Sequence, residues 1–543
     1  MKINNEYNNN SGQRKDDIPF CFLKNRGGFT LGLKSQTMSL VLMFASLGLA
    51  AEQKPNVIYI LTDQWRSSAF GYAGDPVVKT PNIDKFSKEA VIFSNAVSVC
   101  PVCTPHRASL MTGRFPTSTG MFLNDLYLPE TELCMAEIFK SAGYSTAYYG
   151  KWHLDGHGRF NFVQPDRRQG FDFWKANECD HDYNHEHYYE NDDLQIKYWP
   201  KYSPFAMEED VELYLDKLAE RKNPFLLFVS FGTPHFPHQT ALDEYKKIYP
   251  TLELAFRKNV TEEKFPGIRE ELQGYYAHST ATDKAIGDLI NKLKKLNLFD
   301  NSIIIFTSDH GEMMGSHGVR PKEKQLAWDE SVKVPFLIHV PGLEMNGGKA
   351  IASPLTTPDI LPTMLSLANI EIPKSIEGED LSSMIRNPGK QKDRSALFMS
   401  VSPFATTPFT AYRGIKTIQY TYVKTPDKAS ALFDNATDPF QINNLIDRPE
   451  YQKLQQKMEK LLQKELKAIG DQNFKTGKYY FDKWGYDLKE GQSAPYNTIV
   501  GQKTKLVFPF THIGIFHVIN RFFDYNFGIR CICNREATYT NVQ

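Results

Sequence analysis

The chain has 543 residues, 41% of them hydrophobic and 23% charged, and its formal net charge at pH 7 is +0. This length allows two or three domains with large hydrophobic cores. The even charge balance and the lack of a basic block argue against a nucleic-acid partner. Seven cysteines are an odd number and too few for a disulfide-stabilised scaffold.

The N-terminal region combines a polar leader with a short apolar segment. Residues 1–37 are Asn-rich and lack periodicity, so we expect disorder there. Residues 38–51 hold about a dozen apolar residues, too few to span a bilayer as a helix. We interpret them as a signal peptide cleaved near Ala50 or Ala51, with a buried strand or helix as the alternative. A periplasmic or secreted protein without a stable membrane span is expected, and translation that starts at Met38 would omit the leader.

Apolar runs typical of buried strands alternate with segments typical of helices. Strands are predicted at residues 56–62, 91–97, 144–149, 224–231, 302–307 and 334–341. Helices are predicted at residues 80–90, 133–142, 207–221, 270–296 and 359–368. This alternation indicates a parallel sheet flanked by helices. Farther along, residues 413–423 and 431–434 read as antiparallel strands, and residues 451–469 as an amphipathic helix.

Polar side chains follow four of the predicted strands. Ligands of α/β proteins bind at the carboxyl ends of the strands, so these side chains are candidates for a common site. A carboxylate there is a candidate metal ligand, and a plain loop residue is the alternative. The side chains are those of Asp63 and Gln64, Lys151 and His153, His235 and His238, and Asp309 and His310.

Cys103 stands just before a predicted helix start. Pro105 suits the first helical turn, and Arg107 follows one turn after the cysteine on the same face. A helix N-terminus with a guanidinium favours an anion or a thiolate. Cys100 and Cys103 also form a C-x-x-C pair, which leaves a redox pair, half a zinc site or a plain buried cysteine as alternatives.

The run Cys103-Thr104-Pro105-His106-Arg107, followed by Ala-Ser-Leu-Met-Thr-Gly-Arg, resembles the signature of the formylglycine-dependent type I sulfatases. In that family the cysteine is oxidised to formylglycine (3-oxoalanine) by a formylglycine-generating maturation enzyme, and the hydrated aldehyde is the nucleophile. The resemblance extends from about residue 54 to residue 487.

The resemblance implies a fold. It predicts an alkaline-phosphatase-like α/β/α sandwich over residues 54–395, with a large mixed, mostly parallel sheet. A small C-terminal α+β subdomain with an antiparallel sheet would follow at residues 396–487. Residues 488–543 form an extension of unassigned role, which contains Cys531 and Cys533.

The resemblance also implies roles for the side chains at the strand ends. The metal ligands would be Asp63, Gln64, Cys103, Asp309 and His310. The cation would be Ca²⁺, with Mg²⁺ or Mn²⁺ as alternatives, because oxygen donors dominate the set. Gln64 departs from the family, which carries a second acidic residue at this position.

The implied catalytic residues surround the nucleophile. His153 would assist as a base, and His235 would bind the sulfate and donate a proton to the leaving oxygen. Lys151 and Lys324 would contact the sulfate. The complete implied set is Cys103, Arg107, Lys151, His153, His235 and Lys324.

Residues 170–200 are rich in aromatic, acidic and histidine side chains. We favour a loop that lines a substrate cleft, and a metal site at His181, His185 and His187 is the alternative. The substrate-contact candidates are Trp174, His181, Asn184, His185, Tyr188 and His238.

These features favour a sulfuric ester hydrolase that releases sulfate from a sulfated carbohydrate. One alternative keeps the scaffold and makes the chain a phosphonate monoester or phosphodiester hydrolase. The other is a non-catalytic relative that binds sulfated glycans.

Overall fold

The computed structural model describes residues 54–343, 348–404 and 410–498. The predicted leader, the predicted signal peptide, and residues 499–543 with Cys531 and Cys533 lie outside the described residues. Among the described helices, none combines the length and apolar character needed to cross a bilayer.

A ten-stranded sheet forms the centre of the fold, in the order β11-β2-β10-β9-β1-β8-β4-β5-β6-β7. The five strands from β9 to β5 are parallel to one another, whereas β10, β6 and β7 pair antiparallel. The predicted mixed, mostly parallel sheet is thus confirmed. The strands are β1 (Asn56–Asp63), β2 (Val91–Phe93), β4 (Ser145–Lys151), β5 (Phe173–Asn177), β6 (His187–Glu190), β7 (Lys197–Tyr198), β8 (Phe225–Pro234), β9 (Ser302–Ser308), β10 (Phe336–His339) and β11 (Lys349–Ile351).

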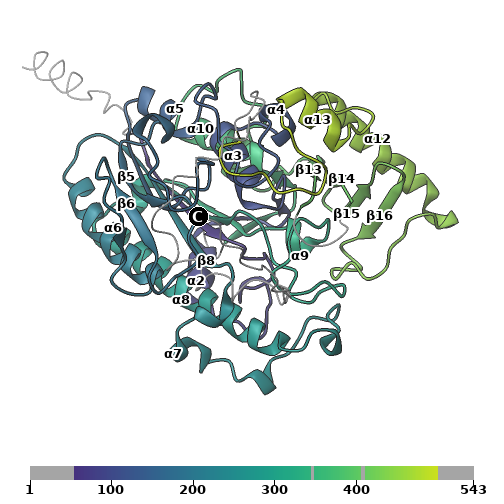
Figure 1. Cartoon of the computed structure of the whole chain (residues 1–543), viewed down its shortest axis with the longest axis horizontal. Helices are drawn as coiled ribbons and strands as arrows, with labels where there is room; N and C mark the ends of the chain where they lie inside the picture. Colours follow the sequence, from purple (N-terminus) through teal and green to yellow (C-terminus); the bar gives the residue numbers. More distant parts are fainter. Residues whose placement is uncertain (1–53, 344–347, 405–409, 499–543) are drawn as a thin grey trace, which may run out of the picture. The chain divides into compact units, whose positions relative to one another are not determined.

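Helices cover both faces of this sheet (Figure 1). Because side chains alternate along a strand, Tyr59 of β1 packs into one core and Ile60 into the other. Helices α3, α5 and α10 contribute to the first core, and α2, α6 and α8 to the second. The helices of this region are α2 (Pro81–Phe86), α3 (Cys103–Thr112), α4 (Pro116–Thr119), α5 (Met135–Ser141), α6 (Ser203–Ala219), α7 (Asp243–Lys246), α8 (Ile268–Lys295), α9 (Asp329–Val332), α10 (Ile360–Leu367) and α11 (Ser382–Arg386).

The strand predicted at residues 91–97 is interrupted. Its first half is β2 of the large sheet, whereas β3 (Ala96–Val97) pairs with β12 (Leu355–Thr356) in a separate two-stranded sheet. The chain leaves the large sheet here and runs toward Cys103. Short 3-10 turns connect the larger elements at Ser87–Glu89, Pro165–Arg167, His238–Thr240, Thr251–Glu253, Glu262–Lys264, Phe299–Asn301, Thr357–Asp359 and Pro449–Tyr451.

The C-terminal part forms a separate four-stranded antiparallel sheet in the order β13-β14-β15-β16, as predicted. The run at residues 413–423 is a hairpin, and β13 adds a strand that the sequence pattern missed. Helix α12 packs on β14 and β15. The elements are β13 (Ala396–Ser400), β14 (Tyr412–Lys416), β15 (Tyr420–Lys424), β16 (Ala429–Asp434), α12 (Gln452–Ala468) and α13 (Gly477–Trp484).

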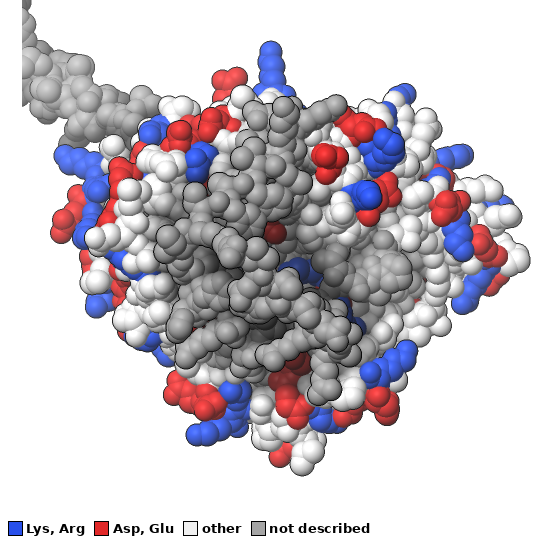
Figure 2. Space-filling view, in the orientation of Figure 1, with Lys and Arg blue, Asp and Glu red and all other residues white. Residues whose placement is uncertain are grey.

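Charged side chains of both signs are interspersed along the margins of the face shown in Figure 2. This mixed surface agrees with the net charge of +0.

Candidate active site

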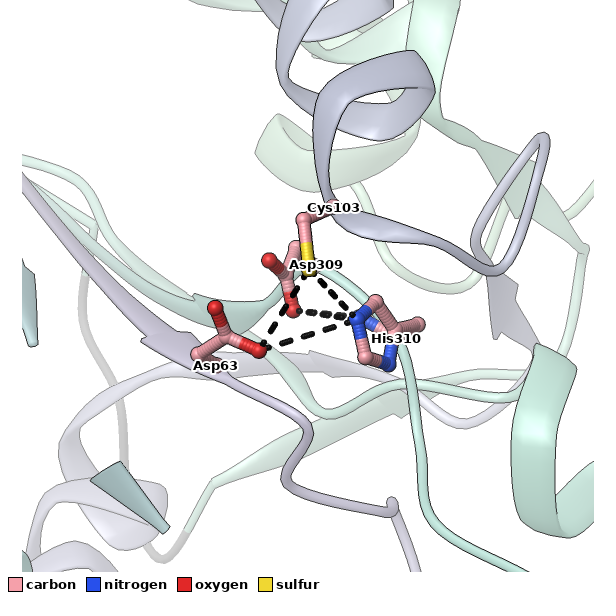
Figure 3. A group of neighbouring side chains, drawn as sticks. All are labelled: Asp63, Cys103, Asp309 and His310. Atoms are coloured by element: carbon pink, nitrogen blue, oxygen red, sulfur yellow. Dashed lines mark hydrogen bonds and ion pairs between the residues drawn. The ribbon is translucent and has the colours of Figure 1, made fainter. Parts of the chain in front are cut away.

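Four parallel strands bring polar side chains to one edge of the sheet. Asp63 ends β1, Lys151 ends β4, Asp309 follows β9 and His235 follows β8. The register of β1 and β9 places Thr62 beside Ser308, so the two aspartates come together. Figure 3 shows Asp63 and Asp309 facing Cys103 at the start of α3.

Cys103 is the first residue of α3 and is buried. The preceding segment is fixed by hydrogen bonds from Met399 N to the Val99 carbonyl oxygen (2.7 Å) and from Val99 N to Thr357 Oγ1 (3.0 Å). The thiol therefore sits at a helix N-terminus, where the first backbone N–H groups favour negative charge.

Two lysines and a histidine surround the Cys103 sulfur. Lys151 Nζ and Lys324 Nζ each lie 3.8 Å from Sγ, and His310 Nε2 lies 3.3 Å from it. Burial and the charge of Asp63 raise the pKa of the thiol, but positive charges led by Lys151 outweigh both and hold the pKa well below its usual range. This position therefore stabilises an anion at the side chain of residue 103.

Cys100 lies in a different environment although it is only three residues away. Burial raises the pKa of its thiol to about 12, and the charge of Arg413 offsets only part of that effect. Both cysteines are free thiols, so the C-x-x-C pair is not a disulfide. Only Cys103 occupies a site that stabilises negative charge.

Arg107 holds the two aspartates in place one helical turn after Cys103. Its Nη2 lies 3.1 Å from Asp309 Oδ2 and 3.4 Å from Asp63 Oδ2. Its Nη1 donates to the Lys151 carbonyl oxygen (2.7 Å) and to Ser230 Oγ (2.9 Å). The guanidinium therefore ties α3 to the ends of β1, β4, β8 and β9.

The pKa values of the two aspartates are shifted in opposite directions. Asp63 Oδ2 accepts a 2.6 Å hydrogen bond from Lys151 Nζ, and nearby cations led by Lys151 overcome burial to hold the pKa of Asp63 well below its usual range. Burial and the charge of Asp63 raise the pKa of Asp309. Two buried carboxylates this close together favour a bound cation.

Asp63, Cys103, Asp309 and His310 each offer a ligand atom, and these atoms lie within 4.8 Å of one another. His310 Nδ1 donates to the Gly311 carbonyl oxygen (3.0 Å), which leaves Nε2 facing the carboxylates. A histidine oriented in this way by a backbone carbonyl is a typical metal ligand. The donor set fits a divalent cation.

The Gln64 amide is held from both ends. Its Oε1 accepts from Lys324 Nζ (2.9 Å), and its Nε2 donates to Glu312. Glu312 also accepts from the backbone N–H groups of Met314 and Lys322. The amide oxygen of Gln64 therefore faces Lys324, and Glu312 sets this orientation.

His153 follows β4, and His235 follows β8. Burial lowers the pKa of His153, but Cys179 and the hydrogen bond to Asp125 Oδ1 (3.0 Å) raise it to about 10. The base role that the resemblance implies for His153 stays a prediction. His235 stacks on His181, with ring centroids 4.3 Å apart.

Three residues of this site were absent from the sequence prediction. Asp125 bonds His153, and Glu312 orients Gln64. Glu178 accepts from the backbone N–H groups of residues 154–156, which fixes the turn after His153. The segments around Asp125 and Glu178 carry no strong periodic signal, and only the tertiary structure brings them to the site.

Several substrate-contact candidates lie away from Cys103. Trp174 is wrong as a substrate contact, because it is fully buried and stacks on Tyr148 in the core. His238 is also fully buried and bonds Glu271 Oε2 (2.7 Å) through Nδ1. Asn184 bonds the Thr240 carbonyl oxygen in the turn after β8, His185 stacks on Tyr198, and Tyr188 stacks on Trp199.

The alternative metal site in the histidine-rich segment is not formed. His181 contacts His235, His185 contacts Tyr198, and His187 bonds Asp180 Oδ2. Within residues 54–343, 348–404 and 410–498, the group of metal-ligating side chains found is the one at Asp63.

Carboxylates at the ends of parallel strands, together with a candidate nucleophile at the N-terminus of a helix, are typical of the alkaline-phosphatase-like hydrolases. A family model described as Sulfatase matches residues 55–370, and one described as N-sulphoglucosamine sulphohydrolase, C-terminal, matches residues 315–468. The chain therefore belongs to the sulfatase family, and it is a sulfuric ester hydrolase.

Similar proteins support this assignment. An ulvan-active sulfatase of Formosa agariphila is 56% identical over 82% of this chain and 87% of its own length. An endo-4-O-sulfatase of Bacteroides thetaiotaomicron is 30% identical over 74% of this chain and 91% of its own. A solved structure from work on glycosaminoglycan metabolism by Bacteroides thetaiotaomicron has a TM-score of 0.71 and 28% identity, and covers 78% of this chain and 98% of its own.

Proposed function

We propose that this sulfatase removes sulfate from a sulfated polysaccharide of the ulvan type, using formylglycine formed at Cys103 and a divalent cation. The observation that carries the proposal is the position of Cys103 Sγ among Lys151, Lys324 and His310, beside two buried aspartates. The polysaccharide class follows from the 56% identity to an ulvan-active sulfatase.

The modification requires a maturation enzyme of the formylglycine-generating type. Cys103 is 1% exposed in the folded chain, so that enzyme would reach it before folding is complete. Once formed, the hydrated aldehyde would supply the nucleophilic oxygen. The same cations that stabilise a thiolate here would stabilise that oxygen as it loses its proton.

The cation would be held by Asp63, Asp309 and His310, and we favour Ca²⁺ because carboxylate oxygens dominate the site. When bound, it would supply Lewis-acid stabilisation of the sulfuryl oxygens. Lys151 and Lys324 add positive charge on the Cys103 side of the site, where the negative charge of the transition state develops. Arg107 keeps both carboxylates oriented, and the Gln64 amide holds Lys324 toward Cys103.

The test is sulfate release from ulvan oligosaccharides, followed by ion chromatography, with chain produced together with a maturation enzyme. Cys103→Ala is the matched control and should release none. A matched pair of aryl sulfate and aryl phosphonate esters should show preference for the sulfate. Turnover of the phosphonate with no sulfate release would contradict the proposal.

We also propose that the mature protein is periplasmic or secreted, which rests on the signal-peptide pattern at residues 38–51. N-terminal sequencing of the exported protein should find a start near Glu52. An exported product that retains residues 1–37 would exclude this cleavage.

A further inference from the structure

Helix α12 presents five lysines to solvent: Lys453, Lys457, Lys460, Lys464 and Lys467. All five are exposed. They are separated by steps of four, three, four and three residues. At 3.6 residues per turn, this spacing places them within an arc of about 80°, along about 21 Å of the helix. We call this surface the lysine face of α12.

The lysine face is not neutralised by its own protein. Among the described residues, none of the five ammonium groups forms a hydrogen bond or an ion pair. The two acidic residues of α12 are only partly exposed and are already engaged. Glu459 bonds Lys424 Nζ (2.7 Å) and Tyr422 Oη (2.7 Å), and Glu465 accepts from Ser395 Oγ (2.7 Å).

Lysines at the end of α8 offer a contrast. Lys292 pairs with Asp216 (2.8 Å) and Lys294 pairs with Glu89 (2.5 Å). Two partly exposed lysines of α8 are therefore paired with acids, whereas the exposed lysines of α12 are not paired with any described acid. The lysine face of α12 therefore has five exposed lysines without an ion pair to the described part of the chain, and no exposed acidic residue of the same helix lies among them.

A groove adjoins the lysine face. It has a volume of about 610 Å³ and runs between α12 and the turn that joins β14 to β15. Lys457 and Lys464 line one side of it, and Gln419 and Tyr420 line the other. Three acids and two further cations also line the groove: Glu379, Asp393, Glu465, Lys392 and Arg394. Glu379 pairs with Lys392 (2.9 Å) and Arg394 (3.2 Å), so this carboxylate is balanced within the protein. Amide and phenol groups can hydrogen-bond or stack against sugar rings, while the lysines are point charges suited to sulfate groups.

We propose that the lysine face of α12 and this groove bind the sulfated polysaccharide itself, at a surface separate from the active site. This proposal rests on the proposed function, because only a polymeric substrate could occupy both places. Figure 1 shows α12 beside the four-stranded sheet and apart from α3, which carries Cys103. The surface would hold the polymer by charge while the active site acts on one of its sulfate esters.

A polyanion with charges spread along its length matches a row of cations better than a small anion does. Nucleic acid is also a polyanion, but the chain has a net charge of +0 and no other basic block. The sulfated substrate of the same enzyme is therefore the occupant that the chemistry favours. RNA and anionic membranes are competing outcomes of the test.

The kinetic test compares a polymer with a short substrate. The variant Lys457→Gln/Lys460→Gln/Lys464→Gln removes the middle of the face. The variant Lys79→Gln/Lys217→Gln/Lys247→Gln is the control, because these lysines are exposed and scattered. At low salt the first variant should raise KM for intact ulvan about tenfold, since several weak charge contacts are lost together. Its kcat/KM for a short ulvan oligosaccharide and the control's KM for ulvan should not change.

Salt gives a second readout. Raising the ionic strength should raise the wild-type KM for ulvan toward that of the variant, because exposed charges are screened. An unchanged KM for ulvan in the α12 variant would overturn the proposal. So would an equal loss on the polymer and the oligosaccharide, which would indicate damage to the active site or the fold.

A binding measurement keeps the result independent of turnover. Full-length Cys103→Ala protein should be retarded in gels that contain ulvan and not in gels that contain desulfated ulvan, and the α12 substitutions should remove the retardation. Tighter binding to RNA or to anionic vesicles than to ulvan would overturn the proposal. If the wild type releases no sulfate from either substrate, the proposed function fails, and the retardation still decides whether the surface binds the sulfated polymer.

Discussion

Lys324 Nζ lies 2.9 Å from Nε2 of His235, and Nδ1 of the same ring lies 2.7 Å from the Phe236 carbonyl oxygen. Nδ1 therefore carries the ring hydrogen, and Nε2 accepts from the ammonium group. Burial and the charge of Lys324 hold the pKa of His235 well below its usual range. In this arrangement the transferable proton beside residue 103 is on Lys324, and His235 is neutral.

This relationship predicts a leaving-group effect for Lys324→Ala. A proton donor matters most when the leaving oxygen is basic, so alkyl sulfates should lose about 100-fold or more in kcat and activated aryl sulfates much less. The measurement is kcat across a series of sulfate esters. Lys322→Gln is the control, because its ammonium pairs with Glu271. Equal losses across the series would show that Lys324 only binds the sulfate.

Metal removal should abolish turnover, because two buried aspartates and His310 form the candidate cation site. Chelator-treated enzyme should regain activity with Ca²⁺, and elemental analysis should find about one ion per chain. Asp309→Asn should weaken calcium binding at least about tenfold, measured by calorimetry. Asp288→Asn, at a partly exposed position of α8 where the carboxylate pairs with Lys284, should bind calcium like the wild type. Full activity of metal-free enzyme would contradict this site.

His278 of α8 should make the fold sensitive to acid. Its Nδ1 accepts from Tyr202 Oη (2.6 Å), and burial lowers its pKa to about 3. An unfolded histidine has a pKa near 6.5, so the unfolded state binds a proton first as the pH falls. The stability that a neutral His278 contributes is therefore complete above pH 6.5 and declines toward pH 3.

The expected loss is about 2 kcal/mol in the free energy of unfolding between pH 7 and pH 5. Urea denaturation at both pH values measures it. His278→Gln should reduce the pH dependence by that amount, whereas His185→Gln, at an exposed position, should leave it unchanged. An unaltered pH dependence in His278→Gln would show that another group is responsible.

Trp174→Ala should destabilise the fold without a specific effect on substrate binding. The side chain is fully buried and stacks on Tyr148 at 5.3 Å, so its truncation should cost about 3–5 kcal/mol. Tyr198→Ala is the comparison, because Tyr198 is 43% exposed and its loss should cost about 0.5 kcal/mol or less. Denaturant midpoints and KM separate the two effects. A raised KM at wild-type stability would restore Trp174 as a substrate contact.

The strand ends of the large sheet could be predicted because apolar runs stop abruptly at polar residues. Asp63 and Asp309 follow such runs, and parallel strands bring their ends to one edge. The order of the strands, and the break between β2 and β3, depend on tertiary pairing that no local pattern encodes. The C-terminal antiparallel sheet was predicted from alternation, but β13 was not, because it is buried throughout.

Side-chain roles were harder to predict than strand ends. An aromatic residue beside a polar loop looks the same in a sequence whether it lines a cleft or fills a core, and Trp174 fills a core. Asp125 bonds His153, and Glu178 accepts from the turn after that histidine. Glu312 accepts from Gln64, and all three contacts join residues that are far apart in the sequence. Their partners could be identified only once the fold placed them.

The most direct test of the account is the mass of the tryptic peptide at residues 89–107, which contains both Cys100 and Cys103. The protein should be produced with a maturation enzyme and alkylated before digestion. We predict a peptide alkylated at Cys100 and about 18 Da lighter than the unmodified chain at residue 103, as for conversion of a thiol to an aldehyde. A peptide alkylated at both cysteines, from enzyme that still releases sulfate, would contradict the formylglycine mechanism.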